Sequence, residues 1–357
     1  MRGTEAQTSS RPAAVPDFPA SEWFNADSPQ VRRQTGFEGD HASRAAPSVC
    51  SERANRHSIR AAAFPLLRTG WSAGLLLVVW LAAGSSYGAM ESRDPWSHLL
   101  AQADTRGLPT RFLQVIEPGF VTLEFSDLRT FAAEYHPEDH RMVLNRALSF
   151  NAAGGRLRPL ATLTPRELST LYHELFHAYL DYLTSRPDAA AADADSARLL
   201  TFARDQQRCR YHIVTITPVL QRKSVTEPRL LTDRESWEAL NETWAVFVGW
   251  AIWTRLELLR GQGGSALPHP SATESWLSRL KKADRDGEFI GYYEPEDPAE
   301  RAMTHKRYLA PFHRISPREV ALLLEVVLGE PAEQSRRSSA VMEPNRPPAP
   351  GGIPCQQ

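Results

Sequence analysis

The sequence has little of what marks several large classes of protein. Only three of its 357 residues are cysteines, too few for a disulfide scaffold. If a leader is removed, Cys209 and Cys355 remain, and a bridge between them is neither excluded nor indicated. A formal net charge of −1 gives no reason to expect nucleic acid as a partner. There is also no Gly-rich phosphate loop and no internal repeat.

The chain also lacks an apolar run of the length that membrane spans prefer. Its longest run, residues 73–84, has twelve residues, whereas a span needs roughly 20. The run fits the core of a signal peptide, with Arg60 and Arg68 as its positive flank and small residues at 86–88 for cleavage. We therefore predict a signal peptide or a short membrane anchor at 71–90. Both interpretations place the part of the chain after this segment outside the cytoplasm, either periplasmic or secreted, or anchored to the membrane.

The position of this segment is unusual, because about seventy residues precede it. Residues 1–70 are rich in Ala, Arg, Ser and Pro without apolar periodicity, which predicts disorder. We therefore favour a later translation start over an anchor. Residues 331–357 are again rich in Pro, Ser and Arg and are predicted to form a disordered tail. The stretch 94–330 is long enough for a full hydrophobic core and is predicted to be a single domain.

Within that domain, a glutamate lies between two histidines. The segment His173-Glu174-Leu175-Phe176-His177 matches the zinc-peptidase pattern H-E-x-x-H. At about 3.6 residues per helical turn, positions four apart lie on nearly the same face, so both imidazoles can reach one metal ion. Glu174 then lies beside the metal as a candidate base.

The sequence around the motif predicts a buried helix. Residues 164–167 read as an N-cap threonine, a proline at the first helical position and a capping-box glutamate. From there to about Ser185, apolar residues recur at steps of three and four. They are Leu168, Leu171, Tyr172, Leu175, Phe176, Tyr179 and Leu183. The two histidines lie at the edge of this stripe, although a satisfied histidine pair in an ordinary amphipathic helix remains the structural alternative.

A catalytic zinc usually takes three protein ligands and leaves one position for water. In metzincins a glycine and a third histidine follow the motif, but Leu180 and Leu183 occupy those positions here, so that class is excluded. A second capping box at 232–235 predicts another helix, to about Arg260. One face of that helix carries Glu235, Glu238 and Glu242.

Beyond Glu242 the same face becomes small and apolar. Ala245 and Gly249 would let another helix pack close, which is what bringing Glu242 to the two histidines requires. A residue at such a boundary belongs at a cleft wall. The alternative is a solvated acidic stripe, and Glu238 and then Glu300 are the substitutes for a third ligand.

The segment Asn241-Glu242-Thr243-Trp244-Ala245 resembles the N-E-x-x-A segment of gluzincin zinc peptidases, in which a glutamate from a second helix completes the metal site. This resemblance implies a zinc ion held by His173, His177 and Glu242. It also implies a zincin-like α+β fold, mostly helical, with a small sheet before the active-site helix. The segment 134–145 looks like the turn and edge strand that border the substrate cleft in such folds.

The chemistry that uses these parts is peptide-bond hydrolysis. Zinc lowers the pKa of its water and polarises a carbonyl, and Glu174 would accept the water's proton and pass it to the leaving amine. We predict an exported zinc metallopeptidase, more an endopeptidase than an exopeptidase, that acts on peptides or proteins. The alternatives are an exported zincin-like binding or scaffold protein without turnover and, less favoured, a membrane-anchored helical protein without metal. The oligomeric state is not indicated.

Other roles are less specific. Asp181, one turn after His177, could orient a ligand imidazole or be an ordinary surface aspartate. An oxyanion stabiliser is expected, and nothing in the spacing chooses among Tyr292, Tyr293, His305 and His313. Further helices are predicted at 271–284 and 317–328, and strands around 121–125 and 142–144.

Overall fold

The computed structural model describes residues 94–128, 132–150, 155–217, 226–261, 270–310, 313–342 and Cys355. The segments 1–70 and 71–90, for which disorder and a signal peptide or anchor were predicted, lie outside these residues. None of the helices in the described part of the chain is both long enough and apolar enough to span a bilayer.

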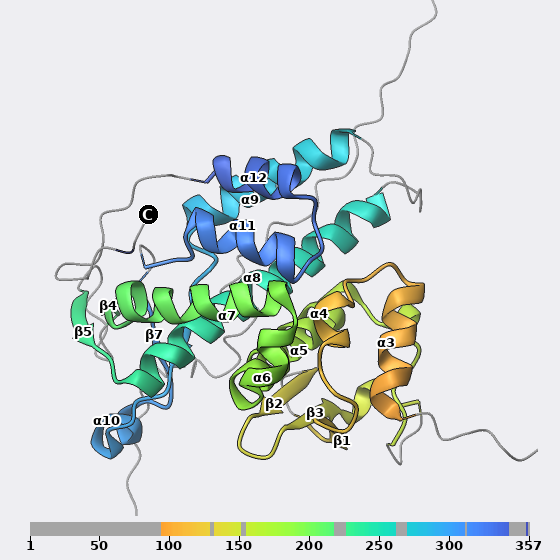
Figure 1. The fold of residues 1–357 in the computed structure, drawn as a ribbon, viewed down its shortest axis with the longest axis horizontal. Helices are drawn as coiled ribbons and strands as arrows, with labels where there is room; N and C mark the ends of the chain where they lie inside the picture. The colour runs from red at the N-terminus through yellow and green to blue at the C-terminus, as the bar shows by residue number, and fades with distance from the viewer. Residues whose placement is uncertain are drawn as a thin grey trace, which may run out of the picture. The chain divides into compact units, whose positions relative to one another are not determined.

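Two long helices carry the two predicted motifs and pack against each other. They are α5 (Pro165–Ser185) and α8 (Asp233–Gly261), shown near the centre of Figure 1. Both begin at the capping boxes that the sequence predicts, Thr164 with Glu167 and Thr232 with Glu235. Each threonine accepts a hydrogen bond from the backbone N–H three residues later, which satisfies one of the unpaired donors at the helix start.

The close approach of α5 and α8 depends on a small residue. The hydroxyl of Ser169 donates a 2.8 Å hydrogen bond to the carbonyl oxygen of Gly249. A Cβ atom at Gly249 would lie only 3.1 Å from the carbonyl oxygen of Ser169 and 3.5 Å from Cβ of His173. The prediction that the small face of the second helix lets another helix approach is therefore confirmed.

A three-stranded sheet lies before α5, as the sequence predicts. It consists of β1 (Thr122–Ser126), β2 (Ala133–His136) and β3 (Arg141–Asn145), in the order β1–β3–β2. Strand β3 pairs parallel with β1 and antiparallel with β2. The expected edge strand after the turn is therefore central, and β2, before the turn, forms the edge. The three central residues of β3 are all buried, which suits a strand with neighbours on both sides.

The remaining elements surround this framework, and the fold is α+β and mostly helical, as predicted. The remaining elements are α3 (Pro95–Thr105), α4 (Arg111–Gln114), η1 (Arg146–Leu148), η2 (Leu160–Thr162), α6 (Pro187–Ala192), α7 (Ala194–Gln206), the π-helical turn η3 (Gln207–Tyr211), β4 (Ile213–Ile216), β5 (Glu227–Leu230), α9 (Pro270–Asp286), β6 (Tyr292–Tyr293), α10 (Pro298–Met303), β7 (Arg307–Tyr308), α11 (Pro317–Val326) and α12 (Ala332–Ala340). Strand β4 pairs with β5, and β6 pairs with β7, both antiparallel.

The core of the domain is built around α5. Phe112 of α4 packs edge-on against Tyr179, with ring centroids 5.3 Å apart. Phe176 lies against Trp244 of α8 at 6.5 Å, and all four of these rings are almost fully buried. Burying such a side chain contributes roughly 1.5–3 kcal/mol. The apolar stripe predicted from the sequence therefore fixes α5 in the core and leaves its histidine edge toward the cleft.

The C-terminal part extends further than predicted. Helix α12 lies inside the stretch 331–357, for which a disordered tail was predicted, and packs against α11. Its buried residues include Ser335 and Ser338, so it has no apolar periodicity that would signal a helix. Further along, Cys355 forms a disulfide with Cys209 of η3, with Cα atoms 5.1 Å apart.

Candidate metal centre

The two histidines of the motif project from α5 toward the same point. Their Nε2 atoms lie 3.1 Å apart, and the rings meet at an interplanar angle of 86°. His173 is 4% exposed and His177 is 9% exposed, so both polar rings are removed from solvent. Two imidazole nitrogens this close and this buried need a shared partner to offset their lost hydration.

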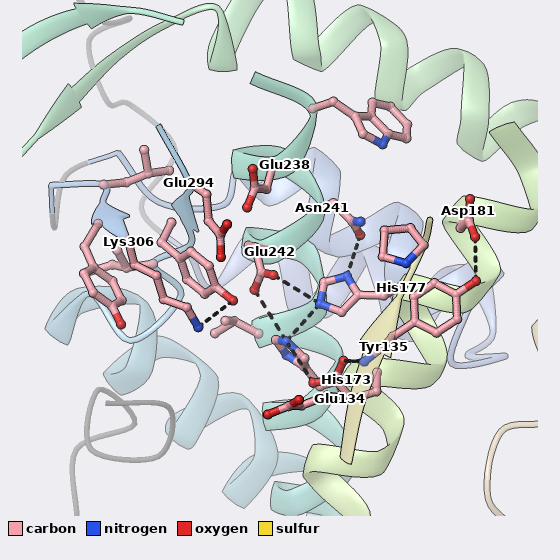
Figure 2. Close-up of a pocket in the computed structure, with 18 of the residues that line it drawn as sticks. Glu134, Tyr135, His173, His177, Asp181, Glu238, Asn241, Glu242, Glu294 and Lys306 are labelled. Atoms are coloured by element: carbon pink, nitrogen blue, oxygen red, sulfur yellow. Dashed lines mark hydrogen bonds and ion pairs between the residues drawn. The ribbon is translucent and has the colours of Figure 1, made fainter. Parts of the chain in front are cut away.

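Glu242 of α8 completes the group. Its Oε2 lies 3.5 Å from Nε2 of His173, and its Oε1 lies 3.4 Å from Nε2 of His177. Figure 2 shows the carboxylate directed at both rings from the neighbouring helix. Among the described residues, these three form the one group of metal-ligating side chains whose donor atoms all lie within 4.8 Å of one another.

The spacing of the donor atoms suits a small divalent ion. Zinc holds imidazole and carboxylate ligands at roughly 2.0–2.1 Å, so two ligands of a tetrahedral site are about 3.3 Å apart. The three closest donor pairs are separated by 3.1, 3.4 and 3.5 Å. The buried group could therefore bind a metal ion without rearrangement of the two helices.

The substitute ligands do not join this group. Glu300 is 7% exposed and is paired with Arg229 and with Arg307, whose Nε is 2.9 Å away. Glu238 lines the same cleft, but burial and the neighbouring Glu242 raise its pKa to about 8. A carboxyl group that tends to keep its proton is a poorer metal ligand than one that is ionised.

The charge states of the three residues favour a cation between them. Burial raises the pKa of Glu242, but the nearby imidazoles of His177 and His173 outweigh it and lower the value to about 2. Burial lowers the pKa of His177 to about 4, so this ring is neutral at pH 7. Burial also opposes protonation of His173, yet the Glu242 and Glu174 carboxylates outweigh it and raise its pKa. Metal binding at this site would displace the proton of His173.

An amide orients one of the ligand rings. Nδ1 of His177 lies 3.0 Å from Oδ1 of Asn241. Because a carbonyl oxygen only accepts hydrogen bonds, Nδ1 carries the proton and Nε2 keeps its lone pair for the metal. No role was predicted for Asn241, although it is the first residue of the N-E-x-x-A segment. Such partners of the ligand rings fix their orientation and tautomer.

Asp181 does not have the role of orienting a ligand ring. Its Oδ2 accepts a hydrogen bond from the hydroxyl of Tyr135 and lies 2.7 Å from Nδ1 of His140. The residue one turn after His177 thus faces the sheet, because α5 is flanked by β2 on that side. The helical spacing placed Asp181 near His177 correctly but could not show which neighbour it meets.

Glu174 lies next to the ligand group without belonging to it. Its Oε2 accepts a 2.9 Å hydrogen bond from the backbone N–H of Tyr135, at the edge strand β2. Its Oε1 is 4.0 Å from Nε2 of His173 and faces the three candidate metal ligands. Burial, with the charge of Glu242, raises the pKa of Glu174 to about 7 against the opposing effect of His173. A base that titrates near neutral pH is well matched to proton transfer.

These residues line one cleft of about 790 Å³. One wall is formed by residues of β2 and α5, another by α8, and a third by the segment that includes β6 and β7. Tyr292 and Lys306 lie in this third wall, with Nζ of Lys306 donating a 3.0 Å hydrogen bond to the phenol oxygen of Tyr292. Burial and the charges of Glu242 and Glu174 raise the pKa of Tyr292 well above its usual range, so its hydroxyl keeps its proton.

Of the four candidate oxyanion stabilisers, only Tyr292 reaches the cleft. Tyr293, its neighbour on β6, points to the opposite side and is 1% exposed. His305 is exposed outside the cleft, and His313 is buried against Tyr211, with ring centroids 5.6 Å apart. Alternation along the two-residue strand separates the tyrosines, and no sequence signal revealed which of them faces inward.

No family model, curated protein or solved structure matches this chain. The interpretation of the site therefore depends on its own geometry and chemistry.

Proposed function

We propose that the protein is an exported zinc-dependent peptidase of zincin type. The observation that carries the proposal is the meeting of His173, His177 and Glu242 beside Glu174 in one cleft. Two imidazoles and a carboxylate from two helices are the donors of catalytic zinc sites in which a glutamate beside the first ligand acts as base. When bound, zinc would supply the electrophile that acidifies a water and polarises a carbonyl.

The residues around the site have separate tasks in this proposal. A water oxygen attacks the carbonyl carbon of the peptide bond while Oε1 of Glu174 accepts its proton. The C–N bond then breaks, and Glu174 returns the proton to the leaving amine nitrogen. The hydroxyl of Tyr292, supported by Lys306, donates a hydrogen bond to the carbonyl oxygen as its negative charge develops.

The edge strand β2 provides a surface for an extended substrate. Strand β3 pairs with one side of β2, and Ala133, Glu134, Tyr135 and His136 all line the cleft. A peptide in extended conformation can lie along such an edge and use the main-chain groups that the bond from Tyr135 to Glu174 leaves open. A peptide that lies along an edge strand through its main chain needs no free terminus there, so this arrangement favours cleavage inside a peptide chain.

The disulfide supports an exported protein. Cys209 and Cys355 are bonded across 146 residues, and such bonds persist in oxidising compartments and are rare in the cytosol. Alkylation of free thiols in protein isolated from its natural compartment tests this point. If the leader that carries Cys50 has been removed, unreactive cysteines before reduction and two reactive ones after it are expected, whereas free Cys209 would count against export.

The central experiment separates metal binding from catalysis. Glu174→Gln should keep one zinc per chain and lose hydrolysis by about 10²–10⁴-fold, because only the base is removed. His177→Ala should lose both zinc and hydrolysis. Glu333→Gln serves as the matched control, since Glu333 is an exposed residue of α12 outside the cleft. Normal hydrolysis by the Glu174 variant would disprove the mechanism. Tight zinc binding by the unaltered chain without cleavage of any peptide in a library would favour the non-catalytic zincin-like binding protein instead.

A further inference from the structure

A second hollow adjoins the cleft at the start of α8. Arg234 and Trp237 line both of them, so the two spaces lie next to each other. Gln207 of η3 lines the hollow and is bound to the start of α8, because its amide donates to the carbonyl oxygen of Asp233 at 2.8 Å and to the hydroxyl of Ser236 at 3.1 Å. A chain that lies along α8 past Glu238 would therefore pass from the cleft directly into this hollow.

The hollow is cationic. Arg204, Arg208, Arg234 and His212 line it, and Asp233 is the one acidic residue in its lining. The guanidinium of Arg204 lies 4.5 Å over the ring of Trp237, which holds it at the boundary with the cleft. Three guanidinium groups against one carboxylate leave a net positive site.

Two of these arginines have no acidic partner among the residues that the structure describes. Within the described part of the chain, neither Arg204 nor Arg208 forms an ion pair, whereas Arg234 lies 3.8 Å from Glu296. Most of the other arginines in the same part of the chain are paired with a glutamate or an aspartate, as Arg307, Arg255 and Arg111 are. The unpaired guanidinium groups thus lie in the hollow that adjoins the cleft.

We propose that this hollow is a substrate subsite that binds a carboxylate of the peptide several residues from the bond that is cut. The inference rests on the proposed peptidase function and adds a substrate preference to it. Planar guanidinium groups match carboxylates through paired hydrogen bonds, which gives them geometric selectivity as well as charge attraction.

Helix geometry sets the position of the acidic group. Arg234 precedes Glu242 by eight residues on α8, a distance of about 12 Å at 1.5 Å per residue. An extended peptide covers that distance in about four residues. The carboxylate belongs either to an Asp or Glu side chain about four residues from the cleavage point or to the free C-terminus of a peptide that ends there.

Charge elsewhere in the cleft sharpens this preference. Glu134, Glu138 and Glu294 line the cleft and do not line the hollow. These carboxylates would repel an acidic side chain near the cleavage point and leave the arginine hollow as the place that accepts one. The proposal therefore predicts position-dependent selection, which a simple preference for acidic peptides would not produce.

The test compares three fluorescent peptides that differ at one position, four residues from a single cleavable bond, with Glu, Gln or Lys. A fourth peptide ends at that position with a free carboxylate, and a fifth ends there as an amide. Binding is measured on the full chain carrying Glu174→Gln, so that no peptide is cleaved. Tighter binding of Glu over Gln, about three- to tenfold and weakening with salt, is expected. The fourth and fifth peptides show whether the C-terminus can serve as the acidic group.

Adding Arg204→Gln and Arg208→Gln together should bring the Glu-to-Gln binding ratio close to one. Arg336→Gln, on α12 and outside both spaces, should leave the ratio as it was. Equal binding of the Glu and Gln peptides, or a ratio that survives loss of both arginines, would overturn the subsite. If the ratio behaves as expected but the chain with Glu174 intact cleaves none of the peptides, the subsite stands and the proposed hydrolysis fails.

Discussion

The backbone N–H of Tyr135 donates a 2.9 Å hydrogen bond to Oε2 of Glu174. The hydroxyl of the same tyrosine donates to Asp181, two turns further along α5. Tyr135 is therefore bound to α5 through both its backbone and its side chain. The backbone bond turns Oε2 of Glu174 away from the three candidate metal ligands and leaves Oε1 facing them. The edge strand thus positions the candidate base as well as offering a surface for substrate.

We expect Tyr135→Phe to lower kcat by about tenfold while zinc content stays at one per chain. The substitution removes the hydroxyl that ties β2 to Asp181 but leaves the three metal ligands untouched, and a small displacement of a catalytic group has large kinetic effects. Turnover on a fluorogenic peptide and zinc by elemental analysis are the measurements. Asp181→Asn keeps an acceptor for the hydroxyl and should lose less. Loss of zinc from Tyr135→Phe would show that the contact supports the fold rather than the base.

Asn241 offers a test of how the ligand rings are oriented. Asn241→Ala should weaken zinc affinity by about 10–100-fold, the range found when a hydrogen-bond partner of a ligand ring is removed. Competition with a chromophoric chelator measures this affinity. Asn241→Asp keeps an oxygen that accepts from Nδ1 of His177 and should retain tighter binding than the alanine variant. Equal affinities for the two variants would exclude the hydrogen bond as the cause.

The local features of the two motif helices could be predicted from the sequence. Both capping boxes, the apolar stripe of α5 and the small residue at Gly249 are consequences of short-range patterns, and the structure confirms them. The meeting of Glu242 with the two histidines was implied by resemblance and by the change of face on α8. The structure brings these side chains together, and zinc as the ion stays a proposal.

What could not be predicted depends on long-range contacts. Asp181 lies at the predicted spacing from His177, yet its partner comes from β2, forty-six residues earlier in the chain. The choice of Tyr292 over Tyr293 depends on which face of β6 turns toward α8. No role could be predicted for Arg204, because nothing in the local sequence shows that α7 ends beside Trp237. Helix α12 was not predicted because its buried positions, Ser335 and Ser338, are polar and produce no apolar periodicity.

Gly291 provides a packing test next to the cleft. A Cβ atom at this position would meet the side chain of Thr243, come within 2.6 Å of its backbone nitrogen and lie 2.9 Å from the carbonyl oxygen of Ala239. Because backbone atoms of α8 cannot yield as a flexible side chain can, Gly291→Ala should push β6 away from the helix and displace Tyr292.

We expect Gly291→Ala to cost about 1–3 kcal/mol of stability and to lower kcat together with it. Urea unfolding and peptide turnover check both effects. Gly249→Ala is the matched comparison, since its new Cβ would lie 3.1 Å from the nearest atom, and it should destabilise the protein less. A Gly291→Ala protein as stable and active as the unaltered chain would mean that β6 shifts without affecting the cleft.

His313 predicts how the stability of the fold changes with pH. Burial, with a contribution from the charge of Arg210, lowers the pKa of His313 to about 3, while in an unfolded chain it is about 6.5. Between these two values the unfolded state binds a proton that the folded state does not. Stability therefore falls as pH decreases from 6.5, by about 1.4 kcal/mol per pH unit for this group.

Because carboxylates also contribute to acid unfolding, the informative quantity is a difference between two proteins. The loss of unfolding free energy from pH 7 to pH 5, measured with urea, should be about 2 kcal/mol larger for the unaltered chain than for His313→Phe. Phenylalanine suits the site because the imidazole packs edge-on against Tyr211. An identical loss for both proteins would show that His313 takes up its proton in the folded state, with its surroundings opening to water as it does so.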